Sequence, residues 1–143
     1  MSGPESIEIW RLVPAPVDEV FRWWTEPDLL RQWMSPVGSV EAEVDLRVGG
    51  RFRIVMREGD TRIDHTGEYL EIQPPARLVF TWVSDFTGAE PSLVTVELER
   101  DATGATRLHL LHSELPEAVA ASHRRGWGAM LDRLAAGLAR VPK

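Results

Sequence analysis

Three polar side chains lie on otherwise hydrophobic faces of predicted strands, and they are the residues best placed to do chemistry. They are His65, Tyr69 and His112. A histidine changes its charge near neutral pH, so it can exchange a proton with a bound molecule, and a tyrosine hydroxyl can orient one. Neighbouring backbone atoms could equally satisfy such groups inside a core. The pattern therefore predicts that these residues bind or orient a ligand, and it assigns no catalytic residue.

Other kinds of reactive site find little support in the sequence. The chain has no cysteine, so it can form neither a thiol nucleophile nor a disulfide. His65 and His112 have no clear third partner for a metal ion, and His109 points to the other side of its strand. Gly49 and Gly50 are typical of a hairpin turn, not of a phosphate-binding loop. We therefore expect neither a metal nor a cofactor.

A sheet must position these side chains, and the alternation of apolar and polar residues predicts one. Strands are expected at residues 7–13, 40–45, 51–57, 61–72, 77–84, 94–99 and 107–112, with two short helices after the first strand. Residues 116–140 carry apolar side chains at steps of three or four, which is typical of one long amphipathic helix. Short turns make consecutive strands antiparallel. The expected class is α+β, a curved antiparallel sheet of about six or seven strands wrapped round a long C-terminal helix.

Length and composition narrow the class of protein. A chain of 143 residues is expected to form one domain, residues 1–143, with a real hydrophobic core. The net charge of -6 argues against a nucleic-acid-binding protein, which usually carries a basic patch. We find no signal peptide and no apolar stretch near the roughly 20 residues of a membrane span. The expected location is the cytoplasm, without membrane association.

The inward faces of the sheet and the long helix could enclose a ligand. Ligand pockets are mostly apolar and carry a few placed polar groups. The pattern predicts apolar and aromatic walls joined by the three polar side chains. The candidate ligand-binding residues are Met56, His65, Tyr69, Phe80, Trp82, Leu110, His112, Trp127 and Leu131. Each of them could also be plain core, so the sequence leaves open whether the cavity is empty or filled by side chains.

Several short motifs occur in an order that resembles a known family. They are Arg11, Ala15-Pro16, Val20-Phe21, residues 24–27, residues 30–33, residues 45–52, residues 67–69, residues 71–82, residues 94–96 and Gly126-Trp127. Together they resemble the START-like (SRPBCC) superfamily, which includes the birch-pollen allergen and has the helix-grip fold. Within it, the chain looks like the small bacterial members of the branch named after the activator of the 90-kDa heat-shock-protein ATPase. The resemblance covers nearly the whole chain.

The resemblance implies one expected function and two alternatives. Members of the superfamily commonly hold an apolar ligand between sheet and helix, so we expect non-enzymatic binding of a small hydrophobic or aromatic molecule. The first alternative is an enzyme of the polyketide cyclase or aromatase kind, in which His65, Tyr69 and His112 would move protons. The second is a chaperone accessory protein acting on an ATPase of the 90-kDa heat-shock type. No segment resembles the chaperone-binding N-terminal domain of the eukaryotic activator.

Some apolar residues are expected on the outer face of the sheet. In the implied fold the first strand pairs with the last, which brings Trp10 and Leu12 beside Leu111 on the convex side. A hydrophobic cluster on a solvated face suggests an interface. We therefore predict a possible homodimer through Trp10, Leu12 and Leu111.

Overall fold

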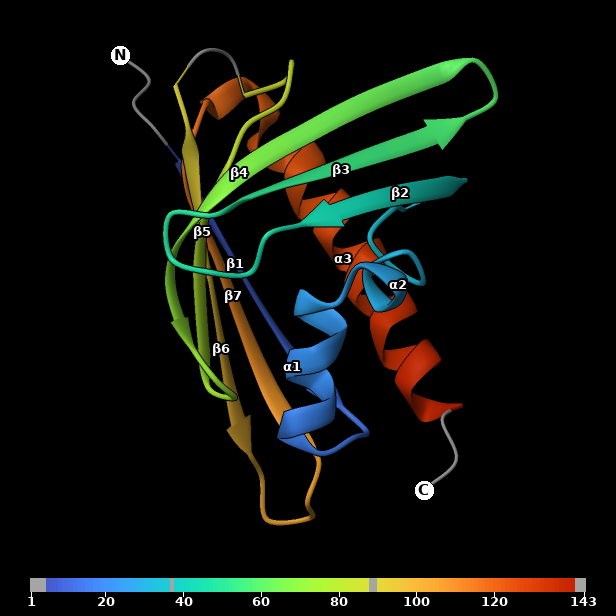
Figure 1. The fold of residues 1–143 in the computed structure, drawn as a ribbon, viewed down its shortest axis with the longest axis vertical. Helices are drawn as coiled ribbons and strands as arrows, with labels where there is room; N and C mark the ends of the chain where they lie inside the picture. The colour runs from blue at the N-terminus through green and yellow to red at the C-terminus, as the bar shows by residue number, and fades with distance from the viewer. Residues whose placement is uncertain (1–4, 37, 88–89, 141–143) are drawn as a thin grey trace.

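The computed structural model describes residues 5–36, 38–87 and 90–140, which form one antiparallel sheet with three helices (Figure 1). The elements follow one another as β1 (Glu5–Val13), α1 (Val17–Thr25), α2 (Pro27–Leu30), β2 (Ser39–Val44), β3 (Arg51–Glu58), β4 (Thr61–Gln73), β5 (Arg77–Trp82), β6 (Ser92–Arg100), β7 (Thr106–Leu115) and α3 (Glu117–Ala139). This is the helix-grip fold, and the predicted α+β class is confirmed.

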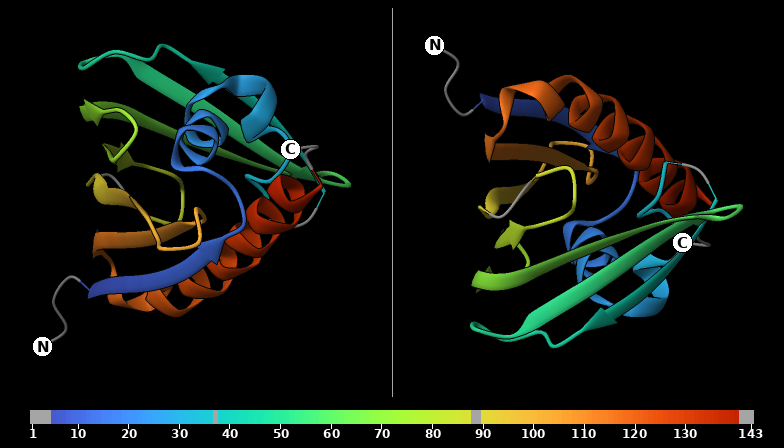
Figure 2. Two further views of the ribbon diagram at one scale, coloured as in Figure 1. Left: turned by 90° about the horizontal axis from the view of Figure 1, so that it is seen from below. Right: turned by 90° about the horizontal axis from the view of Figure 1, so that it is seen from above.

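The seven strands lie in the order β1-β7-β6-β5-β4-β3-β2, so the first strand pairs with the last. All neighbouring strands are antiparallel. The sheet bends strongly, with α1 and α2 inside the bend and α3 across the open side between β1 and the β3–β4 hairpin (Figure 2). Residues that face inward from distant strands are thereby brought round one core.

Alternating burial along the strands agrees with the sequence pattern, with a departure in β4. In β4, His65, Gly67 and Tyr69 face inward as predicted, but a bulge between Tyr69 and Glu71 then shifts the register. The second of the two predicted short helices, α2, spans four residues, after which the chain continues in turns. The bulge adds one unpaired residue, which reverses the side of the sheet that later side chains face.

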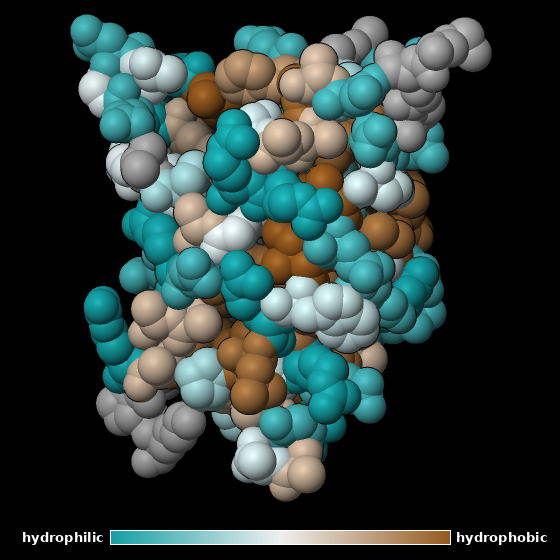
Figure 3. All heavy atoms as spheres, turned by 180° about the vertical axis from the view of Figure 1, so that it is seen from behind, coloured by the Kyte–Doolittle hydropathy of each residue, from teal (hydrophilic) through white to brown (hydrophobic). Residues whose placement is uncertain are grey.

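Helix α3 buries one face and exposes the rest. Its buried side chains are Trp127, Met130, Leu131, Leu134 and Leu138, at the helical spacing that the sequence predicted. Seen from the side on which α3 lies, the surface is largely hydrophilic, with hydrophobic atoms visible along its middle (Figure 3). Among the described residues, no helix combines the length and the hydropathy that crossing a membrane would require.

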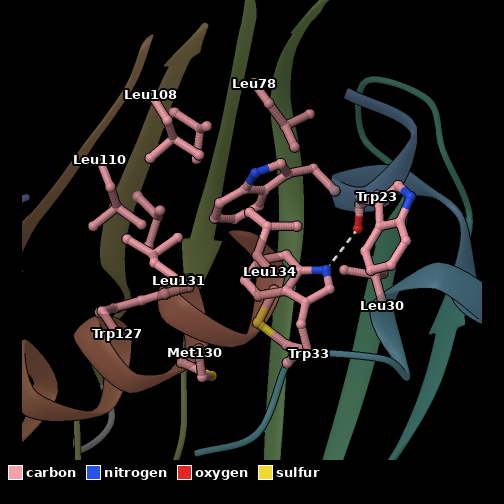
Figure 4. Packing of buried hydrophobic residues seen from close by; sticks show 14 of the residues in the cluster. Trp23, Leu30, Trp33, Leu78, Leu108, Leu110, Trp127, Met130, Leu131 and Leu134 are labelled. Atoms are coloured by element: carbon pink, nitrogen blue, oxygen red, sulfur yellow. Dashed lines mark hydrogen bonds between the residues drawn. The ribbon is translucent and has the colours of Figure 1, made fainter. Parts of the chain in front are cut away.

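Aromatic and aliphatic side chains fill the core where α1, α2 and the sheet meet. Trp33 donates a hydrogen bond from its Nε1 to the backbone carbonyl of Trp23 over 2.9 Å (Figure 4). The ring of Trp24 packs 4.6 Å from that of Trp33 and 6.0 Å from that of Trp127. A space of only about 10 Å³ remains between Trp24 and its neighbours, about the smallest that can hold a single water molecule and far too small for a ligand. This end of the core is therefore closed.

Candidate ligand-binding site

A cavity of about 240 Å³ lies between the first half of α3 and the β3–β4 hairpin, and we call it the helix–hairpin cavity. The right-hand view of Figure 2 looks down on the end of the molecule where these elements meet. The cavity is lined by Pro36, Met56, Ile63, His65, Trp82, Phe86, Ser122, His123, Gly126, Trp127 and Met130. Its walls therefore come from three strands, two connecting segments and one helix.

The predicted site residues divide into three groups in the structure. Four of them, Met56, His65, Trp82 and Trp127, line the helix–hairpin cavity. Tyr69 and Phe80 line the closed space of about 10 Å³ further in.

The remaining three predicted residues, Leu110, His112 and Leu131, are fully buried and line none of the cavities described here. Hence His65 alone of the three polar candidates lies at the cavity wall. Tyr69 is nearly inaccessible, and its burial, with a smaller contribution from Asp45, raises the pKa of its hydroxyl.

His112 joins the sheet to α3 through a chain of hydrogen bonds. Trp127 donates from Nε1 to His112 Nδ1 over 2.9 Å, so this nitrogen carries no proton. His112 Nε2 lies 2.7 Å from the Ser92 hydroxyl, which in turn donates to the carbonyl of Trp82 over 2.6 Å. The neutral ring with its proton on Nε2 satisfies every member of this chain. Burial, helped by the neighbouring His123, lowers the pKa of His112 to about 3.

Two buried nitrogen atoms at the cavity wall lack hydrogen bonds. They are Trp82 Nε1 and His65 Nδ1, neither of which has a partner among the residues that the structure describes. The two rings lie together, with centroids 4.7 Å apart. Burial lowers the pKa of His65 to about 4, against the opposing effect of a hydrogen bond between its ring and the Ile54 backbone, so the ring is neutral at pH 7. Both nitrogen atoms are themselves buried, so they belong to the core beside the cavity and do not face its open space.

His123 stands at the cavity from the α3 side. Its Nδ1 lies 2.9 Å from the carbonyl of Val119 one turn earlier, so this nitrogen donates. The ring also packs edge-on at 5.3 Å from His112. His123 was not among the predicted binding residues, although its spacing of four residues from Trp127 and seven from Met130, on one face of the helix, was a signal.

The hydropathy pattern of the sequence could not identify other lining residues. Phe86 lies in the connection after β5, where no periodicity shows which way a side chain points. Gly126 contributes by having no side chain. No lining residue is an Asp, Glu, Lys or Arg, and the described part of the chain holds no group of three or more His, Asp or Glu that could bind a metal ion. The site is therefore an apolar, uncharged cavity with a few neutral polar groups.

Comparisons with known proteins agree with the fold. The family model described as "Activator of Hsp90 ATPase homolog 1-like protein" matches residues 14–139. A comparison with curated proteins finds no match.

Solved structures from several bacteria are similar. A Chromobacterium violaceum protein is 28% identical with a TM-score of 0.80, over 92% of this chain and 96% of that one. The AHSA1 protein of Silicibacter pomeroyi is also 28% identical with a TM-score of 0.80, over 94% of this chain and 98% of that one. CalU16 of Micromonospora echinospora is 31% identical with a TM-score of 0.75, over 96% of this chain and 78% of that one.

Proposed function

This chain belongs to the family of activator of Hsp90 ATPase homolog 1-like proteins, and we propose that it binds a small hydrophobic or aromatic molecule in the helix–hairpin cavity. One observation carries the proposal. The cavity of about 240 Å³ has apolar and aromatic walls, and a few polar residues, His65, Ser122 and His123, lie in its lining. Apolar walls with a few placed polar groups are typical of small-molecule sites.

The binding is proposed to be non-enzymatic. A proton-transferring site needs a group with a suitable pKa within reach of the ligand. His112 makes hydrogen bonds through both ring nitrogens, and Tyr69 lies at the closed end of the core. The cyclase-like alternative therefore depends on His65, whose pKa burial lowers to about 4. Release of an altered product from a bound polyketide, lost in His65→Ala, would favour that alternative.

The proposal is tested by titrating ligands into the wild type and into a variant in which an added side chain fills part of the cavity. Calorimetry and tryptophan fluorescence would be recorded against fatty acids, flavonoids, sterols and aromatic polyketides, because Trp82 and Trp127 line the cavity. Ser122→Phe adds a ring at an exposed position that lines the cavity, and Ala121→Phe adds the same ring at the neighbouring exposed position, which lies outside the lining. We expect saturable binding that only Ser122→Phe weakens. Equal binding by both variants, or no binding by the wild type, would refute the proposal.

A partner ATPase whose footprint covers the outer surface and avoids the cavity would favour the chaperone alternative.

A second surface supports a homodimer, which we propose forms through the outer faces of β1 and β7. Trp10 and Leu12 are 55% and 60% exposed. Trp10 stacks on His109 of β7 at a ring distance of 4.1 Å, while Leu111 is half-buried on the same face. Exposed apolar clusters of this kind mark interfaces.

The free edge of β1 is less suited to contact with a second copy of the chain than the outer face of the strand is. Arg11 donates to the carbonyl of Trp10 over 3.0 Å, and Arg124 donates to that of Glu8 over 3.4 Å. Guanidinium groups thus occupy acceptors that a second strand would need. We expect Trp10→Glu to reduce the mass measured by sedimentation to that of a monomer, while Leu46→Glu, at another exposed leucine, does not. A wild-type monomer would overturn the dimer.

A further inference from the structure

We infer that the ligand is elongated: an apolar chain with one uncharged polar end, such as a hydroxyl group, which extends from the helix–hairpin cavity along the β3–β4 hairpin. This inference rests on the proposed function and gives the ligand a shape. It is drawn from a second space beside the cavity, from the side chains that separate the two spaces, and from the change in polarity between them.

A smaller space lies next to the helix–hairpin cavity, and we call it the hairpin-end hollow. It measures about 80 Å³ and is lined by Ser35, Pro36, Met56, Arg57, Glu58, Thr61 and Ile63. Three of these residues, Pro36, Met56 and Ile63, also line the helix–hairpin cavity, and we call them the partition. The two spaces therefore adjoin, with the partition between them.

The pairing of β3 with β4 places the two spaces end to end. Met56 pairs with Ile63 across the two strands. Two residues nearer the turn, Glu58 pairs with Thr61. Since side chains two residues apart share a face, both pairs lie on the inner face that also carries His65. From His65 to Thr61 this row runs about 13 Å along the strand, toward the hairpin turn at the upper right of Figure 1. A ligand that follows the row is elongated.

Met56 is the member of the partition that can move aside. The Ile63 side chain is branched at Cβ and the Pro36 side chain is a closed ring, so both have few conformations. Methionine is unbranched with three rotatable bonds, and its thioether adapts to a neighbouring apolar group. An apolar chain that displaces Met56 from the cavity side reaches the hairpin-end hollow. Trp127 cannot yield in this way, because its Nε1 donates to His112.

Polarity rises from the helix–hairpin cavity to the hairpin-end hollow. Among the described residues, no Asp, Glu, Lys or Arg lines the cavity, whereas the exposed residues Glu58 and Thr61 line the hollow. Arg57 lines it too, but its guanidinium pairs with Glu41 over 3.3 Å. A hydroxyl group can donate to the Glu58 carboxylate and accept from Thr61, whereas a carboxylate would meet the like charge of Glu58. The polar end of the ligand therefore belongs at the hairpin-end hollow and its apolar body in the cavity.

The volumes of the two spaces set the expected chain length. A cavity of about 150 Å³ holds the six carbons of benzene. On that scale the helix–hairpin cavity, at about 240 Å³, holds about nine or ten carbons, and the hairpin-end hollow, at about 80 Å³, holds about three more. A chain of about twelve carbons therefore needs both spaces, and a chain of about eight needs the cavity only.

Fluorescence titrations with straight-chain 1-alkanols of four to twelve carbons test the inference, because Trp82 and Trp127 line the cavity and report binding. Each buried methylene should raise the affinity about fourfold, and we expect the wild type to gain affinity up to dodecanol. Dodecanoate should bind more weakly than dodecanol. In the dodecanol complex, nuclear Overhauser effects should join the protons on the carbon that bears the hydroxyl group to the Thr61 methyl group.

Two variants alter the partition or the hairpin-end hollow, and each has a matched control. Met56→Ile keeps the number of side-chain heavy atoms and stiffens the partition, whereas Met130→Ile makes the same change at a buried residue that lines the cavity but not the hollow. Thr61→Phe adds a ring at an exposed position that lines the hollow, and Arg62→Phe adds it at the neighbouring exposed position outside the lining. We expect Met56→Ile and Thr61→Phe to lower the ratio of dodecanol affinity to octanol affinity about tenfold, and both controls to leave it unchanged.

Several outcomes would overturn the inference and leave ligand binding itself intact. One is a ratio that is the same in the wild type and in either of the two variants, or that falls equally in a variant and its control. Another is a wild-type affinity that stops rising at octanol, and a third is tighter binding of dodecanoate than of dodecanol. A wild type that binds no alkanol but binds a flat aromatic member of the wider panel would sink the inference alone, and a wild type that binds nothing would sink the proposed function as well.

Discussion

Stability should fall steeply as the pH is lowered from 6.5 to 4.5, because two buried histidines resist protonation. Burial lowers the pKa of His112 to about 3 and that of His65 to about 4, from an ordinary value of 6.5. Below pH 6.5 the unfolded chain binds two protons that the folded chain excludes. The contribution of these histidines is therefore complete above pH 6.5 and is lost as the pH falls toward 4 for His65 and 3 for His112.

The size of the effect follows from the two shifts. One pKa unit corresponds to about 1.4 kcal/mol, so at pH 5 each histidine has lost about 2 kcal/mol and the pair about 4 kcal/mol. Glu8, Glu26, Asp64 and Asp101 also have lowered pKa values, but they start from 4.5 or 3.8 and therefore titrate below this window. Between pH 4.5 and 6.5 the slope belongs to the buried histidines.

Urea unfolding at half-unit steps of pH, followed by circular dichroism, measures this slope. His112→Gln is the matched variant, because a glutamine can accept from Trp127 and donate to Ser92 but does not titrate. We expect its free energy of unfolding to depend on pH about half as steeply as that of the wild type. If the free energy of unfolding of the variant and of the wild type had the same slope against pH, His112 would not be a residue whose protonation the fold opposes. A wild-type free energy of unfolding that did not change with pH would refute the reasoning for both histidines.

Two further predictions concern packing and buried hydrogen bonds. Gly137→Ala should lower the free energy of unfolding by about 1–3 kcal/mol, because its Cβ would lie 2.8 Å from the Trp23 ring; unchanged stability in urea unfolding would contradict this close contact. Ser92→Ala should cost about 1–3 kcal/mol by leaving His112 Nε2 without its partner, whereas Ser113→Ala, which removes a bond of 3.5 Å at a half-buried site, should cost less. Equal losses in the two serine variants would argue against the chain of bonds through His112.

The sequence was most informative where a residue's surroundings depend on its own strand or helix. Alternation placed His65 and Tyr69 on the inner face of β4, and helical spacing placed Trp127 on the buried face of α3. Burial, however, is not the same as access to a cavity. His65 and Tyr69 are four residues apart, or about 13 Å along a strand, and that distance separates the open end of the core from the closed one.

What the pattern could not supply comes from contacts between distant elements. His112 looked equivalent to His65, yet it lies behind Trp127, which donates to it across the core. Gly126 carries no side chain, so no hydropathy pattern marks it as part of a wall. The bulge after Tyr69 is one residue long, and a single insertion leaves no trace in an alternating sequence until the pairing of β4 with β5 is known. Each of these features depends on tertiary packing that local periodicity does not encode.

The same contacts explain why an apolar space of this size can persist beside a well-packed core. Side chains normally collapse into such a space, since packing contacts are lost around it. Trp127 lines the cavity, but its N–H bond to His112 fixes it to β7. Trp82 is held against Phe52 and His65, at ring distances of 6.1 and 4.7 Å. Gly126 has no side chain that could fill the space. The cavity is thus kept open by a hydrogen bond, two tilted ring contacts and a missing side chain, none of which the apolar pattern requires, and this favours a binding role over incidental looseness in the core.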